Sequence, residues 1–184
     1  MSHALTPLLA PRSIALIGAS SNAGRIGGMP LDLLQRFGYA GKVFPINPKY
    51  SEIFGNRCYP DVEALPEAPD LAVLAIGAQE VVPMLERCHA RGIGAAIVYA
   101  AGFAEAGEDG AALQRTLEAF VRRSGMAVAG PNCMGFANLN LHAYTAFASI
   151  FVNVPPQTVP GRVSILTQSG NVCSAVFGLV RRRG

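Results

Sequence analysis

Short apolar runs alternate with amphipathic segments along the first 130 residues of the chain. Each apolar run ends near Gly or Pro, which is typical of buried strands. The runs are residues 13–18, 42–47, 70–77, 94–100 and 126–130. The segments that repeat apolar positions at helical spacing are residues 30–37, 80–90 and 111–125. Continuously apolar strands separated by helices predict a parallel sheet covered on both faces, so we expect a Rossmann-like, doubly wound α/β domain over residues 1–150.

The pattern changes after Asn138 and restarts near the end of the chain. Residues 151–161 are rich in proline and predict a linker. Residues 162–184 then predict a strand, a turn and a helix that begins at about Asn171. The apolar residues of this helix are Val172, Cys173, Val176, Leu179 and Val180. Because a lone strand and helix cannot bury both faces, we expect either the start of a truncated second α/β domain or one that is completed by another chain, a partner or a second copy in a homo-oligomer.

The composition allows a sizeable core and excludes several classes of protein. The chain has 184 residues, of which 51% are hydrophobic and 15% charged. Three of its 15 basic residues, Arg181 to Arg183, account for the net charge of +3, because the other 12 face 12 acidic residues. No basic stripe indicates nucleic-acid binding. No apolar run reaches the roughly 18 residues of a membrane span, and Pro7, Pro11 and Arg12 interrupt any signal peptide.

The reactive side chains do not form a catalytic pattern. The four cysteines are far apart and make no CxxC pair, which indicates reduced thiols and a cytoplasmic protein. His3, His89 and His142 are equally dispersed, so we expect no metal site. Neither a carboxylate pair nor a nucleophile triad is visible. The pattern favours a domain that holds a cofactor.

Two loops suggest which cofactor the first domain holds, because ligands of doubly wound sheets bind beyond the carboxyl ends of the strands. Residues 18–28 are rich in Gly and Ser, and amides near a helix start can hold phosphate, unless this is only a tight turn. After the second strand, Lys49 stands where an NAD-binding unit carries a carboxylate. A lysine there suits the 2′-phosphate of NADP or the 3′-phosphate of coenzyme A; otherwise it is a solvated loop residue.

Six segments, in order along nearly the whole chain, resemble one family. They are IALIGASSNAGRIGG, GYAGKVFPINPKY, DLAVLAIGA, VYAAGFAEAG, GPNCMGFAN and VSILTQSGNV. Together they resemble the CoA-binding domain, and the beginning of the next domain, of the NDP-forming acyl-CoA synthetases, relatives of the succinyl-CoA ligase α subunit. The resemblance implies a Rossmann-like domain, followed at residues 162–184 by the start of a flavodoxin-like, succinyl-CoA ligase-like domain.

The resemblance also implies a coenzyme A site spread over the loops. The implied cofactor-binding residues are Lys49 at the adenosine phosphate; Gly18, Ser20, Ser21 and Asn22 at the other phosphates; Gly77, Ala78, Ala101 and Gly102 along the pantetheine; and Asn132 and Cys133 near the thiol. The family commonly has Val-Pro-Ala where this chain has Ile76-Gly77-Ala78, so the pantetheine channel here would differ in shape.

In this family the second domain stabilises a phosphohistidine at a helix start, which Ser169, Gly170 and Asn171 would form here. The histidine would lie beyond residue 184, so we expect no catalytic residue within this chain. ATP, ADP and Mg²⁺ would bind to an ATP-grasp domain or subunit, also absent. An ADP-forming ligase such as acetate–CoA ligase interconverts acyl-CoA, ADP and phosphate with acid, CoA and ATP. This chain alone should not complete that reaction.

Two other functions remain open at this point. The chain could be the NADP-binding domain of an oxidoreductase, which Lys49 would fit equally well. It could also be a non-catalytic CoA-sensing module of the kind fused to protein acetyltransferases. Cys133 is either a small residue that fills the turn or a neighbour of the CoA thiol. No cationic neighbour in the sequence marks it as a nucleophile.

Overall fold

A parallel five-stranded sheet forms the centre of the computed structural model, which describes residues 4–153 and 163–183. Its strands are β1 (Ser13–Ile17), β2 (Lys42–Ile46), β5 (Leu71–Leu74), β6 (Ala95–Val98) and β7 (Ala127–Ala129). Their spatial order is β2-β1-β5-β6-β7, and all neighbours pair in parallel. Because this is one of the doubly wound orders, with its switch point between β1 and β5, the predicted α/β fold is confirmed.

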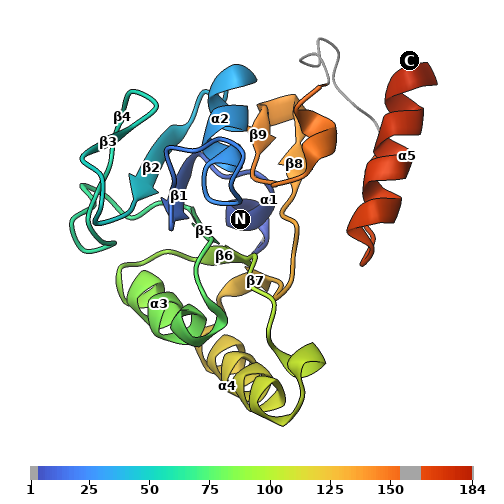
Figure 1. Ribbon diagram of the computed structural model, residues 1–184. Coiled ribbons are helices and arrows are strands. Elements are labelled where there is room, and N and C mark those ends of the chain that lie inside the picture. The colour runs from blue at the N-terminus through green and yellow to red at the C-terminus, as the bar shows by residue number, and fades with distance from the viewer. Residues whose placement is uncertain (1–3, 154–162, 184) are drawn as a thin grey trace.

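Helices cover both faces of the sheet, as the continuously apolar strands require (Figure 1). On β1, Ala15 and Ile17 face a cluster with α3 (Ala78–Ala90) and α4 (Glu108–Ser124). Ile14 and Leu16 face the opposite cluster, with α2 (Met29–Arg36). This alternation follows from the two-residue period of a strand. The edge strand β7 is only partly buried along its whole length.

The helix boundaries follow local capping. α3 begins at Ala78, two residues before the predicted start, because the Glu80 carboxylate accepts a hydrogen bond from the Gly77 N–H. α4 ends at Gly125, whose φ of 67° is the left-handed conformation that glycine adopts readily. These caps place Ala78 in the first turn of α3.

Small elements that the apolar pattern did not predict join the main ones. They are the helix α1 (Thr6–Leu9), the hairpins β3 (Glu52–Ile53) with β4 (Asn56–Arg57) and β8 (Ala137–Asn138) with β9 (Ala143–Tyr144), and the 3-10 turns η1 (Ala104–Ala106), η2 (Leu139–Leu141) and η3 (Ser149–Phe151). Strands of two residues are too short to show a period. Tyr144 of β9 stacks on Phe37, with ring centroids 4.0 Å apart, which joins this hairpin to the end of α2.

The strand predicted after the linker is wrong, because residues 163–169 form none. Val163 is 74% exposed and Leu166 is fully exposed. A β-strand needs a neighbouring strand for its backbone hydrogen bonds, and the described residues offer none here. Residues 154–162, most of the predicted linker, lie outside the described residues, and the domain limits at 150 and 161 stay predictions.

The final helix, α5 (Gly170–Arg183), forms as predicted and lies to one side of the β8–β9 unit (Figure 1). Phe177 packs edge-on against Phe151, with ring centroids 5.0 Å apart. The apolar residues on which the prediction was based are left largely exposed, with Val172 at 52% and Leu179 at 51%. One chain therefore does not bury both sides of this helix; its covering by a partner or a second copy stays a prediction.

Candidate functional site

The loops after the five parallel strands meet along one edge of the sheet, where doubly wound proteins bind their ligands. They comprise residues 18–28 after β1, 47–51 after β2, 75–77 after β5, 99–103 after β6 and 130–136 after β7. Every predicted cofactor-binding residue lies in one of these loops, except Ala78, which begins α3. Four strand spacings separate the two ends of the edge, or about 19 Å.

The loop after β1 packs closely against the end of β5. Gly18 has a φ of +82°, and a Cβ at this position would lie 2.3 Å from the carbonyl oxygen of Ala75. A Cβ on Gly27 would lie 2.1 Å from the carbonyl oxygen of Gly18, so the loop also folds back on itself. Both glycines are therefore required by close backbone approach, which brings the loop to the switch point of the sheet.

The polar side chains of this loop shape it and leave donors free. The Ser20 hydroxyl oxygen accepts a hydrogen bond from the Asn22 N–H at 3.1 Å, and Asn22 Oδ1 accepts one from the Gly24 N–H at 2.9 Å. Ser21 is exposed, and within the described chain its N–H has no intramolecular partner. An oxyanion at this loop would find this amide and the hydroxyl protons of Ser20 and Ser21.

The turn after β2 carries Lys49 and is fastened to the loop after β1. Asn47 Nδ2 donates to the carbonyl oxygen of Ala19 at 2.8 Å, and Asn47 Oδ1 accepts from the Lys49 N–H at 3.0 Å. The Lys49 side chain is exposed, and no ion pair to it occurs in the part of the chain that the structure describes. The lysine ammonium is therefore free to meet a phosphate.

Carboxylates cap the two loops in the middle of the edge. The Gly77 N–H donates to Glu80 Oε2 at 3.2 Å, and the Gly102 N–H donates to Glu105 Oε1 at 2.7 Å. Hydrogen bonding from the Gly102 amide holds the pKa of Glu105 below its ordinary value. With both amides occupied, these loops present small side chains, including the exposed Ala101, to a neutral part of a ligand.

The loop after β7 is built on three unusual backbone positions. The Gly130–Pro131 peptide bond is cis, Gly130 has a φ of +113° and Asn132 has a φ of 53°. The Asn132 N–H donates to the carbonyl oxygen of Ala100 at 2.8 Å. The Cys133 N–H donates to the carbonyl oxygen of Val98 at 3.2 Å. This loop therefore lies against the loop after β6, with the Asn132 side chain exposed.

Cys133 is half-buried and its thiol is not activated. Burial raises the pKa of the thiol above 9.0, and the Gly135 N–H, 3.4 Å from Sγ, offsets this effect only partly. Its neighbour Tyr99 is buried and donates its hydroxyl to the carbonyl oxygen of Thr145, and burial raises the pKa of Tyr99 as well. A neutral thiol beside a neutral phenol is a packing arrangement, without the cation that activates nucleophilic cysteines.

The helix start of the TQSGN segment lies next to this loop. The Ser169 hydroxyl oxygen accepts a hydrogen bond from the Val172 N–H at 3.3 Å, so Ser169 caps α5. A Cβ on Gly170 would lie 1.9 Å from Met134 Sδ, which shows how closely the helix start approaches the segment after Cys133. Asn171 follows in the first turn and is exposed. Two segments separated by a proline-rich stretch thus come together in space.

Contacts connect the loops in the order of the strands. The turn with Lys49 touches the loop after β1 through Asn47, and Ala78 lies 3.6 Å from the Cβ position of Gly102. Asn132 bonds to the loop after β6, and Met134 meets α5. The predicted adenosine, phosphate, pantetheine and thiol positions therefore follow one another along the edge. Their contact with coenzyme A stays a prediction.

Two residues of the edge were missed in the sequence. Arg25 is exposed in the loop after β1, and no ion pair to it occurs within the described residues. Its position inside the Gly-rich segment could have identified it, since cations favour phosphate. Asn47 connects two loops through its bond to Ala19. An Asn before a Pro is an ordinary turn residue, so the sequence gave no sign of this partner 28 positions away.

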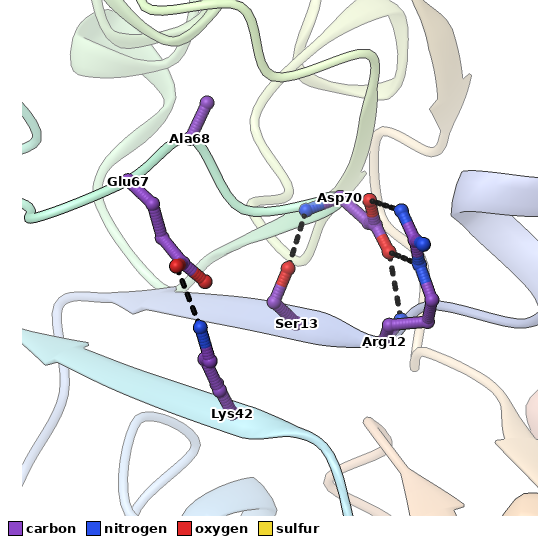
Figure 2. A pocket seen from close by; sticks show the side chains of 6 residues that line it. All are labelled: Arg12, Ser13, Lys42, Glu67, Ala68 and Asp70. Atoms are coloured by element: carbon purple, nitrogen blue, oxygen red, sulfur yellow. Dashed lines mark hydrogen bonds and ion pairs between the residues drawn. The ribbon is translucent and has the colours of Figure 1, made fainter.

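The opposite, amino edge of the sheet contains a separate pocket of about 270 Å³ (Figure 2). Its charges are mutually satisfied, since Arg12 pairs with Asp70 at 3.2 Å and Lys42 with Glu67 at 2.6 Å. Burial would raise the pKa of Asp70, but hydrogen bonds from Arg12 outweigh it and hold the pKa below its ordinary value. This pocket joins strand ends and lies away from the predicted ligand loops.

Across residues 4–153 and 163–183, His, Cys, Asp and Glu side chains form no group of three that could hold a metal ion. The helices in these ranges are all too short or too polar to span a bilayer.

Comparisons with known proteins agree with the geometry. The family model described as CoA binding domain matches residues 12–138. The ADP-forming acetate–CoA ligase I of Archaeoglobus fulgidus is 38% identical over 96% of this chain, and the trans-feruloyl-CoA synthase of an unknown prokaryotic organism is 37% identical over 96%. The chain spans 25% of the length of each of these relatives. Among solved structures, the dinucleotide-forming acetyl-coenzyme A synthetase 1 of Ca. Korarchaeum cryptofilum, in complex with phosphate and ADP, is similar with a TM-score of 0.85 and 32% identity, over 97% of this chain and 37% of that one.

Proposed function

Because the chain belongs to the CoA binding domain family, we propose that it binds coenzyme A as one part of an ADP-forming acid–CoA ligase. The observation that carries this proposal is the turn after β2. Lys49, a cation without an acidic partner among the described residues, stands where an NAD-binding domain needs a carboxylate, and Asn47 fastens its turn to the Gly-rich loop. A ribose phosphate and a pyrophosphate could therefore be held side by side.

The order of the loops gives the proposed direction of the cofactor. The 3′-phosphate of CoA would meet Lys49, and the pyrophosphate would meet the loop of Ser20 and Ser21. The pantetheine would run past the small residues of the next two loops, and the thiol would end beside Asn132. Among the five described loops, lysine and arginine occur only at the phosphate end of this path, which matches the charge distribution of coenzyme A.

In this proposal the chain holds coenzyme A and performs no bond-breaking step alone. The Ser169 to Asn171 helix start, next to Met134, would stabilise a phosphoryl group close to the cofactor thiol, because free amides and the helix dipole favour an anion there. The phosphorylated histidine and the ATP-grasp unit would come from further sequence or from a partner chain. The acid substrate would bind there too.

Calorimetric titration with CoA and with 3′-dephospho-CoA, under reducing conditions, tests the proposal. We expect CoA to bind more tightly than dephospho-CoA, and Lys49→Ala to weaken CoA by about 5- to 10-fold while changing dephospho-CoA little. Lys42→Ala is the matched control, because Lys42 lies at the amino edge and is paired with Glu67. Failure of the unmutated chain to bind CoA would refute the proposal, and saturable binding of NADPH instead would favour the oxidoreductase alternative.

A further inference from the structure

Asn47 occupies a junction between two loops that the proposed function assigns to different phosphates. It is the first residue after β2, and its backbone N–H donates to the carbonyl oxygen of Tyr59 at 2.9 Å. Its side chain donates to Ala19 on one side and accepts from Lys49 on the other. Both hydrogen-bonding ends of the amide are used, each for a different loop.

On the Lys49 side, Asn47 stabilises the turn with two hydrogen bonds, one to its main-chain oxygen and one to its side-chain oxygen. Its carbonyl oxygen accepts from the Tyr50 N–H at 3.2 Å, which closes a four-residue turn with Pro48 at the second position. Its Oδ1 accepts from the Lys49 N–H, an Asx turn inside the first. The backbone from which the exposed Lys49 side chain extends is therefore fixed by one residue.

On the other side, Asn47 holds the beginning of the Gly-rich loop. Ala19, whose carbonyl oxygen accepts the Asn47 amide, is fully buried and immediately precedes Ser20. The Ser20 N–H donates to the carbonyl oxygen of Gly27 at 3.2 Å, which closes the loop from its start to its end. A displacement of Ala19 would therefore move the whole loop.

We propose that Asn47 is a positioning residue that couples the two phosphate-binding loops, so that the 3′-phosphate and the pyrophosphate of coenzyme A are bound cooperatively. The inference rests on the proposed function. Asn47 itself need not touch the cofactor. It keeps Lys49 at a fixed place relative to the Ser20 loop, and a ligand that spans both loops gains from this fixed relation, because less freedom is lost on binding. A ligand without the 3′-phosphate gains less.

Asn47→Ser should remove the hydrogen bond to Ala19, which couples the two loops, and keep the turn that carries Lys49. A serine hydroxyl can still accept the Lys49 N–H in an ST turn, but it is too short to reach Ala19. Asn47→Thr also keeps a hydroxyl acceptor, loses the amide donor and adds no charge, and it serves if the serine variant does not fold. Asn56→Ser is the matched control, because Asn56 lies in the β3–β4 hairpin and its side chain, within the described chain, donates only to the carbonyl oxygens of Ile53 and Phe54 beside it.

The measurement is the ratio of the dissociation constants of dephospho-CoA and CoA, determined for the unmutated chain, Asn47→Ser, Lys49→Ala and the double variant. We expect Asn47→Ser to lower this ratio by about twofold to tenfold, the worth of one hydrogen bond. We expect it to leave the ratio unchanged once Lys49 is already alanine. Asn56→Ser should leave the ratio as in the unmutated chain.

An unchanged ratio in Asn47→Ser, or equal weakening of both ligands, would overturn the inference and leave Asn47 as a local turn residue. So would a further fall of the ratio in the double variant, since coupling through Lys49 requires the two effects to be non-additive. Absence of CoA binding by the unmutated chain would instead refute the proposed function, before any variant is compared.

Discussion

Single cations distinguish the two edges of the sheet. At the amino edge Arg12 and Lys42 are both paired with carboxylates. At the carboxyl edge Arg25 and Lys49 have no such partner in the described residues. An unpaired cation on a solvated loop costs the folded chain little stability. It contributes most to the binding free energy of a phosphate that displaces its water. Arg25 and Lys49 therefore mark the edge at which an anionic cofactor would bind.

Arg25→Ala should weaken CoA and dephospho-CoA alike, by about 3- to 10-fold, because the loop after β1 would contact the pyrophosphate that both ligands carry. Titration of both ligands at two salt concentrations checks this expectation. The unmutated chain should show the steeper salt dependence, as one charged contact more would require. Arg115→Ala, an exposed arginine on α4, is the control. A loss confined to CoA would contradict the assignment and place Arg25 at the 3′-phosphate.

The burial of Cys133 predicts how the reactivity of its thiol depends on pH. Since burial raises the pKa of its thiol above 9.0, a smaller fraction is thiolate at pH 8 than in an exposed cysteine. Alkylation by iodoacetamide should therefore be slower than for the same residue in the urea-unfolded chain, and its rate should level off at a higher pH than in the unfolded chain. Peptide mass spectrometry resolves Cys133 from the other three cysteines. Rapid alkylation at pH 7 would reveal an activated thiol and contradict the role of a packing residue.

At the scale of elements, the approach of the Gly-rich loop to β5 sets the shape of the site. Gly18→Ala would force a side chain into a φ of +82° and a Cβ to 2.3 Å from Ala75. We expect a loss of about 2–4 kcal/mol in the free energy of unfolding, measured by urea denaturation. Gly94→Ala is the control, because a Cβ there meets nothing within 4 Å, and its effect should stay within about 0.5 kcal/mol. Equal losses for both variants would show that the contact with Ala75 is not a constraint.

The sequence predicted the elements whose signal is local. Strands such as residues 13–17 are almost entirely apolar, and helices such as α4 repeat apolar residues at one spacing, so both were found. The strand after the linker was wrong because its apolar residues indicated burial, whereas the described chain provides no neighbour to pair with. A high β-propensity does not make a strand unless another strand is available to pair with it.

The candidate site was predictable in part for the same reason. Motifs named the loops, and the parallel order of the strands placed them on one edge. What could not be predicted was how the loops touch. The bond from Asn47 to Ala19 and the approach of Met134 to Gly170 join segments that are 28 and 36 positions apart. Such contacts depend on how segments distant in sequence pack together, and the residue pattern of a single sequence carries no local signal for this.

At the scale of the whole molecule, the proposed cofactor would span the sheet from β2 to β7 and would stabilise the loops that follow its strands. A ligand that binds only the folded chain adds a free energy that grows with its concentration, about 2.7 kcal/mol at 100 times the dissociation constant. For a chain of this length, 184 residues, each kcal/mol raises the melting temperature by about 2–4 °C. CoA at this concentration should therefore raise the melting temperature by about 5–10 °C.

Scanning calorimetry with and without CoA measures this rise, and hydrogen exchange shows where it originates. Protection should extend over the loops after β1, β2, β5, β6 and β7 together, because one ligand contacts them all. The paired amino edge around Arg12 and Asp70 should be protected only through global stability. Protection confined to the loop after β1 would mean that only a phosphate is bound. In that case the pantetheine path along the remaining loops would be wrong, even though the melting temperature rises.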